Sequence, residues 1–321
     1  MAKVAQRESA FAEIAADYVV NSTPDLERIY HYTSSEALLS IISSRELWLL
    51  EHSYLSDYSE VAHGLKAVVA ALEKRKGVQL IDLFYGSQTQ LQKLASLTNL
   101  SYQTFIFSMT EDSDSKSQWS EYGNNYKGIC IGFDYKALLT ELLEHEYKVN
   151  YKSENLSLDY VERPVFAKVI YSDEEKEQLI EQMLDKAIEI ANGLPKSLIK
   201  DDRVAKLRAI ITDAHYVLIK LISLFKDKNF EAEQEHRIVV QYPVRACKEI
   251  LTNLAAVDYR IHKSLIVPFH RFRLDNFTKL VVSIGVGPKY GDFKYALTLS
   301  EFCHKNGIKN VAIDKSTLPI Q

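Results

Sequence analysis

The amino-acid sequence predicts an α+β fold, and three observations support this prediction. Short runs rich in β-branched and aromatic residues, which are typical of β-strands, recur along most of the chain. One long helical region at residues 173–225 interrupts these runs, so strands and helices do not alternate regularly as in a series of βαβ units. The 321 residues, 46% of them hydrophobic, can bury a substantial core. We expect one domain over residues 1–321.

The first expected element is an N-terminal helix over residues 1–21. Phe11, Ile14 and Tyr18 recur there at helical spacing, which indicates a helix packed on the body of the protein. Acidic residues interrupt the apolar pattern of this segment, so it does not resemble a signal peptide. The chain also lacks an apolar run long enough to cross a bilayer. These features predict a cytoplasmic protein with no membrane partner.

Strands and one short helix follow the N-terminal segment. Ser34 or Ser35 is placed as the N-cap of a helix with an apolar stripe that includes Leu38 and Ile42. The expected strands cover residues 28–33, 46–50, 104–110, 128–134, 165–172, 236–242, 264–269, 280–287 and 310–314.

The region 173–225 is expected to form an inserted helical hairpin. Asp173 is a candidate cap for its first helix, Gly193 and Pro195 break the pattern, and a second helical pattern then resumes. The apolar stripes of both helices indicate core packing, and their charged residues indicate a solvated face.

Composition excludes several function classes. A formal net charge of −4 provides no global reason to expect nucleic-acid binding, although a local basic face is compatible with it. Cys130, Cys247 and Cys303 are widely spaced and odd in number, which argues against a disulfide framework and fits a reducing compartment. No group of histidines, cysteines and carboxylates has the spacing of metal ligands, so no metal site is predicted.

Two polar segments are candidates for a binding site. His31, Tyr32 and Thr33 lie at the end of the first internal strand, immediately before a helix. A strand carrying Phe107 and Ser108, an acidic serine-rich loop and a short helix bearing Trp119 and Tyr122 occupy residues 105–134, with a turn expected at Asn124–Asn125. These aromatic side chains either form a stacking wall for a planar ring or pack in the core.

The segment 230–240 carries the most informative charges. If it is a strand, Glu233, Glu235 and Arg237 share one face, where the two carboxylates repel each other. Either Arg237 pairs with a glutamate at a solvated sheet edge, or the carboxylates serve a pocket in which one orients substrate and the other stabilises positive charge.

A basic stretch at residues 259–279 interleaves cations with aromatic residues. The cations are Arg260, Lys263, Arg271, Arg273 and Lys279, and the aromatic residues are Tyr259, Phe269, Phe272 and Phe277. Such a pattern fits a single-stranded nucleic-acid surface, and it equally fits a core strand flanked by solvated cations.

These motifs together resemble a bacterial family known only as a domain of unknown function. The matching motifs are His-Tyr-Thr at 31–33, Ser-Asp-x-x-Glu at 56–60, Trp-x-x-Tyr at 119–122, Gly-x-x-x-Gly-Phe-Asp at 128–134 and Glu-x-Glu-x-Arg at 233–237. The chain departs from the family pattern at Ser56, where Asn is common, and at Phe230 and His236, where Trp is common.

The order of elements also resembles, more remotely, the ADP-ribosyltransferase fold of the His-Tyr-Glu type. This resemblance implies a split mixed β-sheet and NAD as co-substrate. His31 and Thr33 would hold the adenosine ribose, and Tyr122, or else Trp119 or Phe107, would stack on nicotinamide. Tyr32 and Ser108 would complete the cofactor site. Glu235 would be the catalytic carboxylate and Glu233 its upstream partner, while Arg237 would either contact the pyrophosphate or, as we favour, hold Glu233.

Two classes of function follow from this resemblance. The first is an NAD-dependent ADP-ribosyltransferase, such as a bacterial toxin or phage-defence effector with a cognate antitoxin, that modifies RNA or DNA in preference to protein. The second is a non-catalytic module that senses a nucleotide or binds a partner with the same pocket. A transferase requires Glu235 for turnover, whereas a sensor tolerates Gln at that position.

Overall fold

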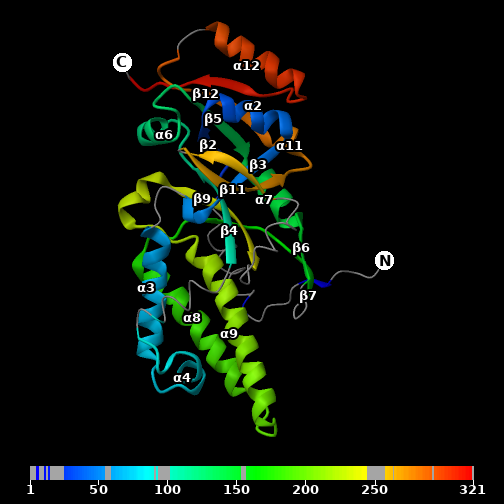
Figure 1. Ribbon diagram of the computed structural model, residues 1–321. Coiled ribbons are helices and arrows are strands. Elements are labelled where there is room, and N and C mark those ends of the chain that lie inside the picture. Colours follow the sequence, from blue (N-terminus) through cyan, green and yellow to red (C-terminus); the bar gives the residue numbers. More distant parts are fainter. Residues whose placement is uncertain are drawn as a thin grey trace.

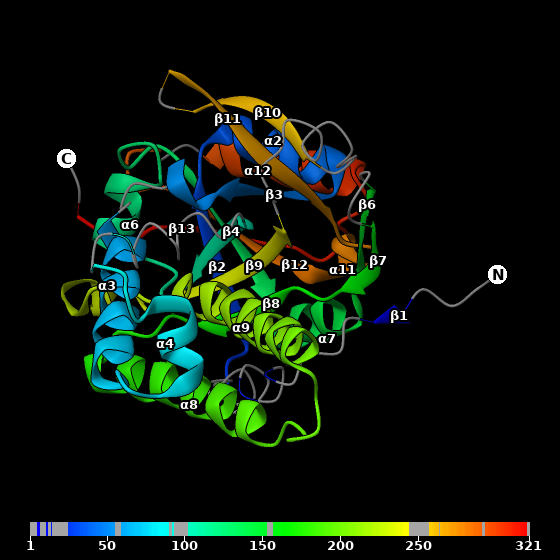
Figure 2. The ribbon, with the colours of Figure 1, turned by 60° about the horizontal axis from the view of Figure 1, so that its bottom comes forward.

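The structure is a computed structural model that describes residues 5–6, 11, 14, 25–54, 59–89, 92, 102–152, 157–243, 257–262, 264–290 and 293–319. A mixed β-sheet forms its upper part in Figure 1, and helices α3, α4, α8 and α9 extend below the sheet (Figures 1 and 2). Helix α12 lies on the opposite side of the sheet in both views. The predicted α+β class is confirmed.

The large sheet has the strand order β10-β11-β3-β4-β2-β5-β12-β13, and β9 pairs with both β4 and β8. Its strands are antiparallel except for the parallel pair β12 and β13. Their bounds are β2 (Arg28–Thr33), β3 (Glu46–Glu51), β4 (Tyr102–Thr110), β5 (Ile129–Asp134), β8 (Val165–Lys168), β9 (Glu235–Pro243), β10 (Val257–His262), β11 (Leu265–Arg273), β12 (Val281–Val286) and β13 (Ala312–Lys315).

Helices surround this sheet, and a second small sheet lies beside it. The small sheet contains β1 (Ala5–Gln6), β6 (Tyr147–Lys152) and β7 (Ser157–Glu162). The helices are α2 (Ser35–Ser44), η1 (His52–Tyr54), α3 (Ser59–Lys74), α4 (Gln79–Tyr85), α6 (Lys116–Glu121), α7 (Tyr135–Glu144), α8 (Asp173–Asn192), α9 (Lys200–Ile222), η2 (Lys228–Glu233), α11 (Phe277–Leu280) and α12 (Phe293–Lys305).

The sheet splits along one edge of β4. Strand β9 pairs with β4 from Tyr102 to Thr110 and therefore occupies one edge along its whole length. On the other edge, β3 pairs with Phe105 and Ile106, whereas β2 pairs with Thr110. Because a strand has two hydrogen-bonding edges, β2 and β3 must share this one, and they separate at the residues between Ile106 and Thr110.

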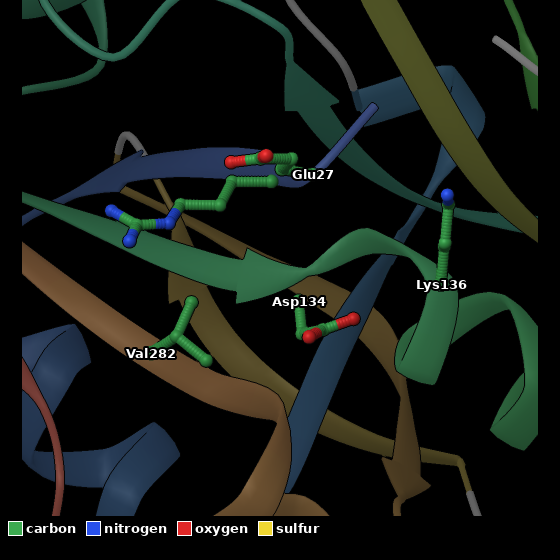
Figure 3. Close-up of a pocket in the computed structure, with 5 residues that line it drawn as sticks. Glu27, Asp134, Lys136 and Val282 are labelled. Carbon is green, nitrogen blue, oxygen red and sulfur yellow. The ribbon is translucent and has the colours of Figure 1, made fainter. Parts of the chain in front are cut away.

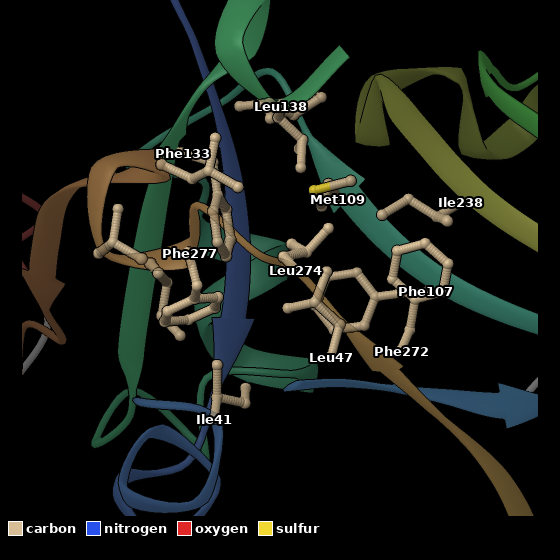
Figure 4. Close-up of a cluster of buried hydrophobic side chains, with 14 of the residues drawn as sticks. Ile41, Leu47, Phe107, Met109, Phe133, Leu138, Ile238, Phe272, Leu274 and Phe277 are labelled. Carbon is tan, nitrogen blue, oxygen red and sulfur yellow. The ribbon is translucent and has the colours of Figure 1, made fainter. Parts of the chain in front are cut away.

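Both faces of the central strands are buried. Along β4, Phe107 and Met109 belong to one apolar cluster, which also contains Ile238 of β9 (Figure 4). Ile106 and Val239 point to the opposite face and join a second cluster formed with α3, α8 and α9. This period-two alternation between two cores explains why the central strands read as continuous apolar runs in the sequence.

Most predicted elements are present, and four details of the prediction are wrong. Of the two N-caps predicted for α2, Ser34 is confirmed, because its side chain accepts a hydrogen bond from the Ala37 amide. The cap of α8 is Ser172 instead of Asp173, because the Ser172 hydroxyl accepts a hydrogen bond from the Glu175 amide. The predicted strand at 165–172 ends at Lys168.

Two further corrections concern the N-terminal segment and the charged strand. Ala5–Gln6 of the expected N-terminal helix forms strand β1, because its backbone pairs with the edge of β7. Apart from these residues, Phe11 and Ile14, the expected helix lies outside the described residues. The segment 230–240 is not one strand, because η2 ends at Glu233 and the left-handed conformation of Gln234 separates it from β9.

The predicted helical hairpin is present as α8 and α9, which pack on each other and on α3. Within the described part of the chain, no helix is both long enough and apolar enough to cross a membrane.

Candidate functional site

A cavity of about 540 Å³ opens where β2 and β3 separate from β4. We call it the strand-split pocket. Residues of β2, β3, β4 and β10 line it, together with one face of α2 and the end of α6. Among the residues predicted for the site, His31, Tyr32, Thr33, Phe107, Ser108 and Tyr122 line this cavity.

His31 is fixed by the split itself. Its Nδ1 lies 2.9 Å from the carbonyl oxygen of Ser108, and its ring stacks on Phe107 with 4.1 Å between the centroids. Ser108 lies in the part of β4 that pairs with neither β2 nor β3, so the imidazole satisfies a carbonyl that a strand would otherwise satisfy. With Nδ1 donating to this carbonyl, Nε2 is left as a hydrogen-bond acceptor.

The environment keeps His31 neutral. Burial lowers its pKa to about 4, the hydrogen bond to Ser108 opposes that shift, and the positive charge of Arg260 adds to it. A neutral imidazole accepts a hydrogen bond from a ligand hydroxyl group, as a ribose would supply.

Tyr32 and Trp119 brace the acidic serine-rich loop. The Tyr32 hydroxyl donates to the carbonyl of Asp112 and accepts from the amide of Ser115. The Trp119 indole donates to a carboxylate oxygen of Asp114 at 2.8 Å and meets the Tyr32 ring edge-on. Trp119 is buried and is absent from the pocket wall, which favours the core-packing alternative for this residue.

Tyr122 has the exposure expected of a stacking residue. It follows α6 directly, lines the pocket and exposes 40% of its surface. The predicted turn after it is confirmed, because Asn124, Asn125 and Tyr126 all have positive φ angles. Asn tolerates this left-handed conformation better than most residues, so the local sequence favours the turn that directs Tyr122 to the pocket.

Glu233, Glu235 and Arg237 form a charged cluster with Lys226, a residue that the sequence analysis did not consider. Lys226 Nζ lies 2.7 Å from Glu233 Oε2 and 2.8 Å from Glu235 Oε2. Arg237 Nε lies 2.8 Å from Glu235 Oε1, and its Nη1 donates to the carbonyl of Ser223. The predicted repulsion between the two carboxylates is therefore offset by a lysine that lies between them.

The two carboxylates of this cluster have different proton affinities. Burial by itself would raise the pKa of Glu235, but Arg237 and Lys226 lower it to about 2. Burial raises the pKa of Glu233 above its usual value, although Lys226 opposes the shift. Glu235 is therefore an anion at neutral pH, whereas Glu233 is the better proton acceptor of the pair.

Tyr122 connects the charged cluster to the strand-split pocket. Burial and the negative charge of Glu233, with a contribution from Glu235, raise the pKa of Tyr122 to about 12. None of Glu233, Glu235 and Arg237 is itself among the described residues that line the pocket. Thr110, opposite Glu235 in the β4–β9 ladder, donates its hydroxyl to the Glu233 carbonyl and so fixes the cluster at the end of β4.

A second hollow, of about 350 Å³, lies at the start of β2 and the end of β5 (Figure 3). Glu27, Arg28, Asp134, Lys136 and Val282 line it. It carries charges of both signs and holds none of the predicted site residues, so the strand-split pocket is the better candidate site.

The structure divides the basic stretch at 259–279 between the core, the surface and the pocket. Phe269, Phe272 and Phe277 are buried and cannot stack on bases, which favours the core-strand alternative. Arg271 is exposed on β11, and Lys263 lies outside the described residues.

Nine residues that line the pocket were not predicted as site residues from the sequence, and five of them have polar side chains: Ser40, Trp48, Glu121, Arg260 and His262. One signal for them existed in the sequence, because residues two apart on a strand share a face, as Arg260 and His262 do on β10. The acidic motif residue Asp57 lies outside the described residues.

Part of the chain is similar to a known protein family. Residues 118–238 match the model of a family described as a protein of unknown function, DUF2971. The matched segment runs from α6 into β9 and contains Tyr122, Glu233, Glu235 and Arg237. It confirms, for these residues, the expected resemblance to a family of unknown function. Neither a curated protein nor a solved structure matches the chain.

Proposed function

We propose that the protein is an NAD-dependent ADP-ribosyltransferase that binds NAD in the strand-split pocket. One observation supports this above all: His31 and Tyr122 line the same cavity, and Ser108, which lines it too, lies opposite Arg237 of the charged cluster in the β4–β9 ladder. These are the residue types that the resemblance assigns to ribose binding, nicotinamide stacking and catalysis, and they come from separate parts of the sequence.

The reaction breaks the bond between nicotinamide and C1′ of ribose, and nicotinamide leaves with the bonding electrons. Positive charge then develops at C1′, and the Glu235 anion stabilises it more strongly in the transition state than in the ground state. A nucleophile on the acceptor, or water, forms the new bond to C1′, and Glu233 takes its proton. Tyr122 holds the nicotinamide ring, and the neutral His31 accepts a hydrogen bond from a ribose hydroxyl.

Catalysis in this scheme requires a rearrangement at Glu235. Both of its carboxylate oxygens are bound by Arg237 and Lys226. Either Lys226 moves aside so that the ribose can contact the Glu235 carboxylate, or Glu235 keeps its ion pairs and stabilises the charge at C1′ from a distance.

The same observation favours a second candidate function, a nucleotide-binding module without catalysis. In such a module the pairs of Glu235 with Lys226 and Arg237 are structural and persist when the ligand binds. Turnover distinguishes the two candidates, because both predict that NAD binds.

The test compares the wild-type protein with Glu235→Gln, using Glu231→Gln as a matched control on the exposed side of η2. NAD binding is measured by calorimetry and nicotinamide release by chromatography, with labelled NAD and with RNA, DNA or cell lysate as acceptor. We expect Glu235→Gln to bind NAD and to lose turnover by about 100-fold or more, which corresponds to the loss of one electrostatic contact to the transition state. Glu231→Gln should retain both properties.

One result would decide against the transferase, and another would decide against Glu235 as its catalytic residue. Binding of NAD without nicotinamide release under any condition would favour the non-catalytic module. Release that is equal in the wild type and in Glu235→Gln would exclude Glu235 from catalysis. If release depends on Glu235, the labelled fraction identifies the acceptor as nucleic acid or protein.

A further inference from the structure

Arg260 is a half-buried cation on β10 for which the described part of the chain provides no anionic partner. It lines the strand-split pocket, and its guanidinium carbon lies 6.0 Å from the ring centroids of Trp48 and of Phe269. Its Nε is shielded from solvent and meets no hydrogen-bond acceptor among the described residues. The indole nitrogen of Trp48, which also lines the pocket, is likewise shielded and meets no acceptor in the described part of the chain.

Two neighbouring donors without acceptors call for an explanation. A buried donor that is left unsatisfied has lost its hydrogen bonds to water and gained none in return, and native proteins leave few such donors. The cation–π contacts with Trp48 and Phe269 fix the position of the guanidinium but accept no classical hydrogen bond. Arg260 is thus held in place with its hydrogen-bonding capacity unused, which is the arrangement expected of a site for an anion that enters from the pocket.

We infer that Arg260 and Trp48 form a phosphate subsite at the β10 end of the strand-split pocket, which binds the pyrophosphate of NAD. In naming NAD as the ligand, this inference rests on the proposed function. A guanidinium offers several N–H donors in one plane, which suits phosphate oxygens better than the single ammonium of lysine does.

The subsite also orients the ligand. Arg260 and Trp48 line the pocket from β10 and β3, whereas Glu121 and Tyr122 line it from the end of α6. The cation and the carboxylate therefore come from different walls of the cavity. A dinucleotide with its phosphates at Arg260 extends past His31 and brings its nicotinamide end to Tyr122 and the carboxylates.

The test measures binding of ADP-ribose, inorganic pyrophosphate and adenosine by calorimetry, so that it needs no turnover. Arg260→Gln is compared with Arg260→Lys and with Arg273→Gln, an exposed arginine on the adjacent strand β11. We expect Arg260→Gln to weaken ADP-ribose and pyrophosphate binding by about 10- to 100-fold, the range for one charge-assisted hydrogen bond. Arg260→Lys should retain part of the affinity, and adenosine binding should change by less than about twofold in every variant.

Three outcomes would overturn the inference. The first is that the wild type binds neither phosphate-bearing probe. The second is that Arg260→Gln and Arg273→Gln bind ADP-ribose equally well. The third is that Arg260→Gln loses adenosine binding as strongly as pyrophosphate binding, which would indicate that Arg260 only stabilises the pocket wall.

ADP-ribose binding and nicotinamide release, measured together, distinguish a failure of this inference from a failure of the proposed function. Binding of ADP-ribose that depends on Arg260, in a protein that releases no nicotinamide from NAD, would support the subsite and reject the transferase. Nicotinamide release with an unchanged KM for NAD in Arg260→Gln would support the transferase and reject the subsite.

Discussion

Lys226 determines the chemistry of the charged cluster at the scale of single residues. It is buried and contacts both Glu233 and Glu235. A buried carboxylate without a cation would take up a proton instead of keeping its charge. Lys226 and Arg237 therefore allow Glu235 to remain an anion inside the protein, which an electrostatic role at C1′ requires.

Lys226→Met should destabilise the protein, because it leaves buried carboxylates without one of their cations. We expect the free energy of unfolding to fall by about 3–5 kcal/mol at pH 7, the range for breaking a buried ion pair from one side. Urea denaturation measures this change. Lys228→Met, an exposed lysine two residues further on, is the matched control. An equal effect of the two substitutions would mean that the ion pairs of Lys226 contribute little.

Strand β4 explains the location of the pocket at the scale of elements. Between Ile106, which pairs with β3, and Thr110, which pairs with β2, this edge of β4 has no strand partner, and the cavity opens there. His31 then occupies part of the gap through its bond to Ser108. The pocket is thus a consequence of strand pairing.

The turn between α6 and β5 is the second element on which the site depends. Gly128 donates its amide hydrogen to the Gly123 carbonyl at 2.7 Å and accepts from the amide of Gly287. A Cβ atom at position 128 would lie 2.3 Å from the Thr33 carbonyl oxygen and 2.6 Å from the Gly123 carbonyl carbon. Backbone atoms on both sides cannot yield easily, so this position requires glycine.

Gly128→Ala should therefore displace the turn that carries Tyr122. We expect a loss of stability of about 1–3 kcal/mol, typical of an overpacked site, together with weaker ADP-ribose binding. Thermal unfolding and calorimetry measure the two effects. Gly193→Ala is the control, since a Cβ there meets its nearest neighbour at 3.5 Å with an ordinary φ of −72°. Unchanged ADP-ribose binding in Gly128→Ala would show that ligand binding does not depend on this turn.

At the scale of the whole molecule, neutral histidines are buried on both faces of the sheet. His215 of α9 contacts the Tyr85 hydroxyl, and His270 of β11 lies 3.2 Å from the Tyr242 hydroxyl. Burial lowers the pKa of His215 to about 4. Burial, with the positive charges of His145 and Arg271, lowers that of His270 to about 3.

The protein should consequently lose stability in mild acid. Between pH 6.5 and pH 4 the unfolded chain binds protons on these histidines and the folded protein does not, so the free energy of unfolding falls as the pH falls. Each histidine contributes on the order of 3 kcal/mol over this range. Urea denaturation at pH 7.5, 6.0 and 5.0 should show the decline, and His215→Gln should make it shallower. An identical decline in wild type and variant would exclude His215 as a source.

Local sequence patterns predicted most of the elements, but not all of them. The apolar central strands and the amphipathic helices α2, α8 and α9 were recognisable, because burial imposes periods of two and 3.6 residues on the sequence. Strands β6, β7 and β10 were missed, although the residues of β10 alternate strictly between apolar and polar side chains, because the expected strands were limited to runs rich in apolar residues. The boundary between η2 and β9 was missed because the left-handed conformation of Gln234 has no clear signal in its residue type.

The sequence by itself determined the α+β class, the helical hairpin, the turn after Tyr122 and the motif residues that became candidates for the site. Each of these depends on neighbours in the chain, through periodicity, capping or turn preference. Only the tertiary structure decided that Lys226 joins Glu233 and Glu235, that Trp119 is buried, and that Arg260 and Trp48 face the same pocket as His31. Arg260, Trp48 and His31 lie far apart in the sequence, and the sheet order β10-β11-β3-β4-β2 brings them to one cavity. Lys226 is close to Glu233 and Glu235 in the sequence, but no periodic pattern reveals that the chain folds back through η2 to join them.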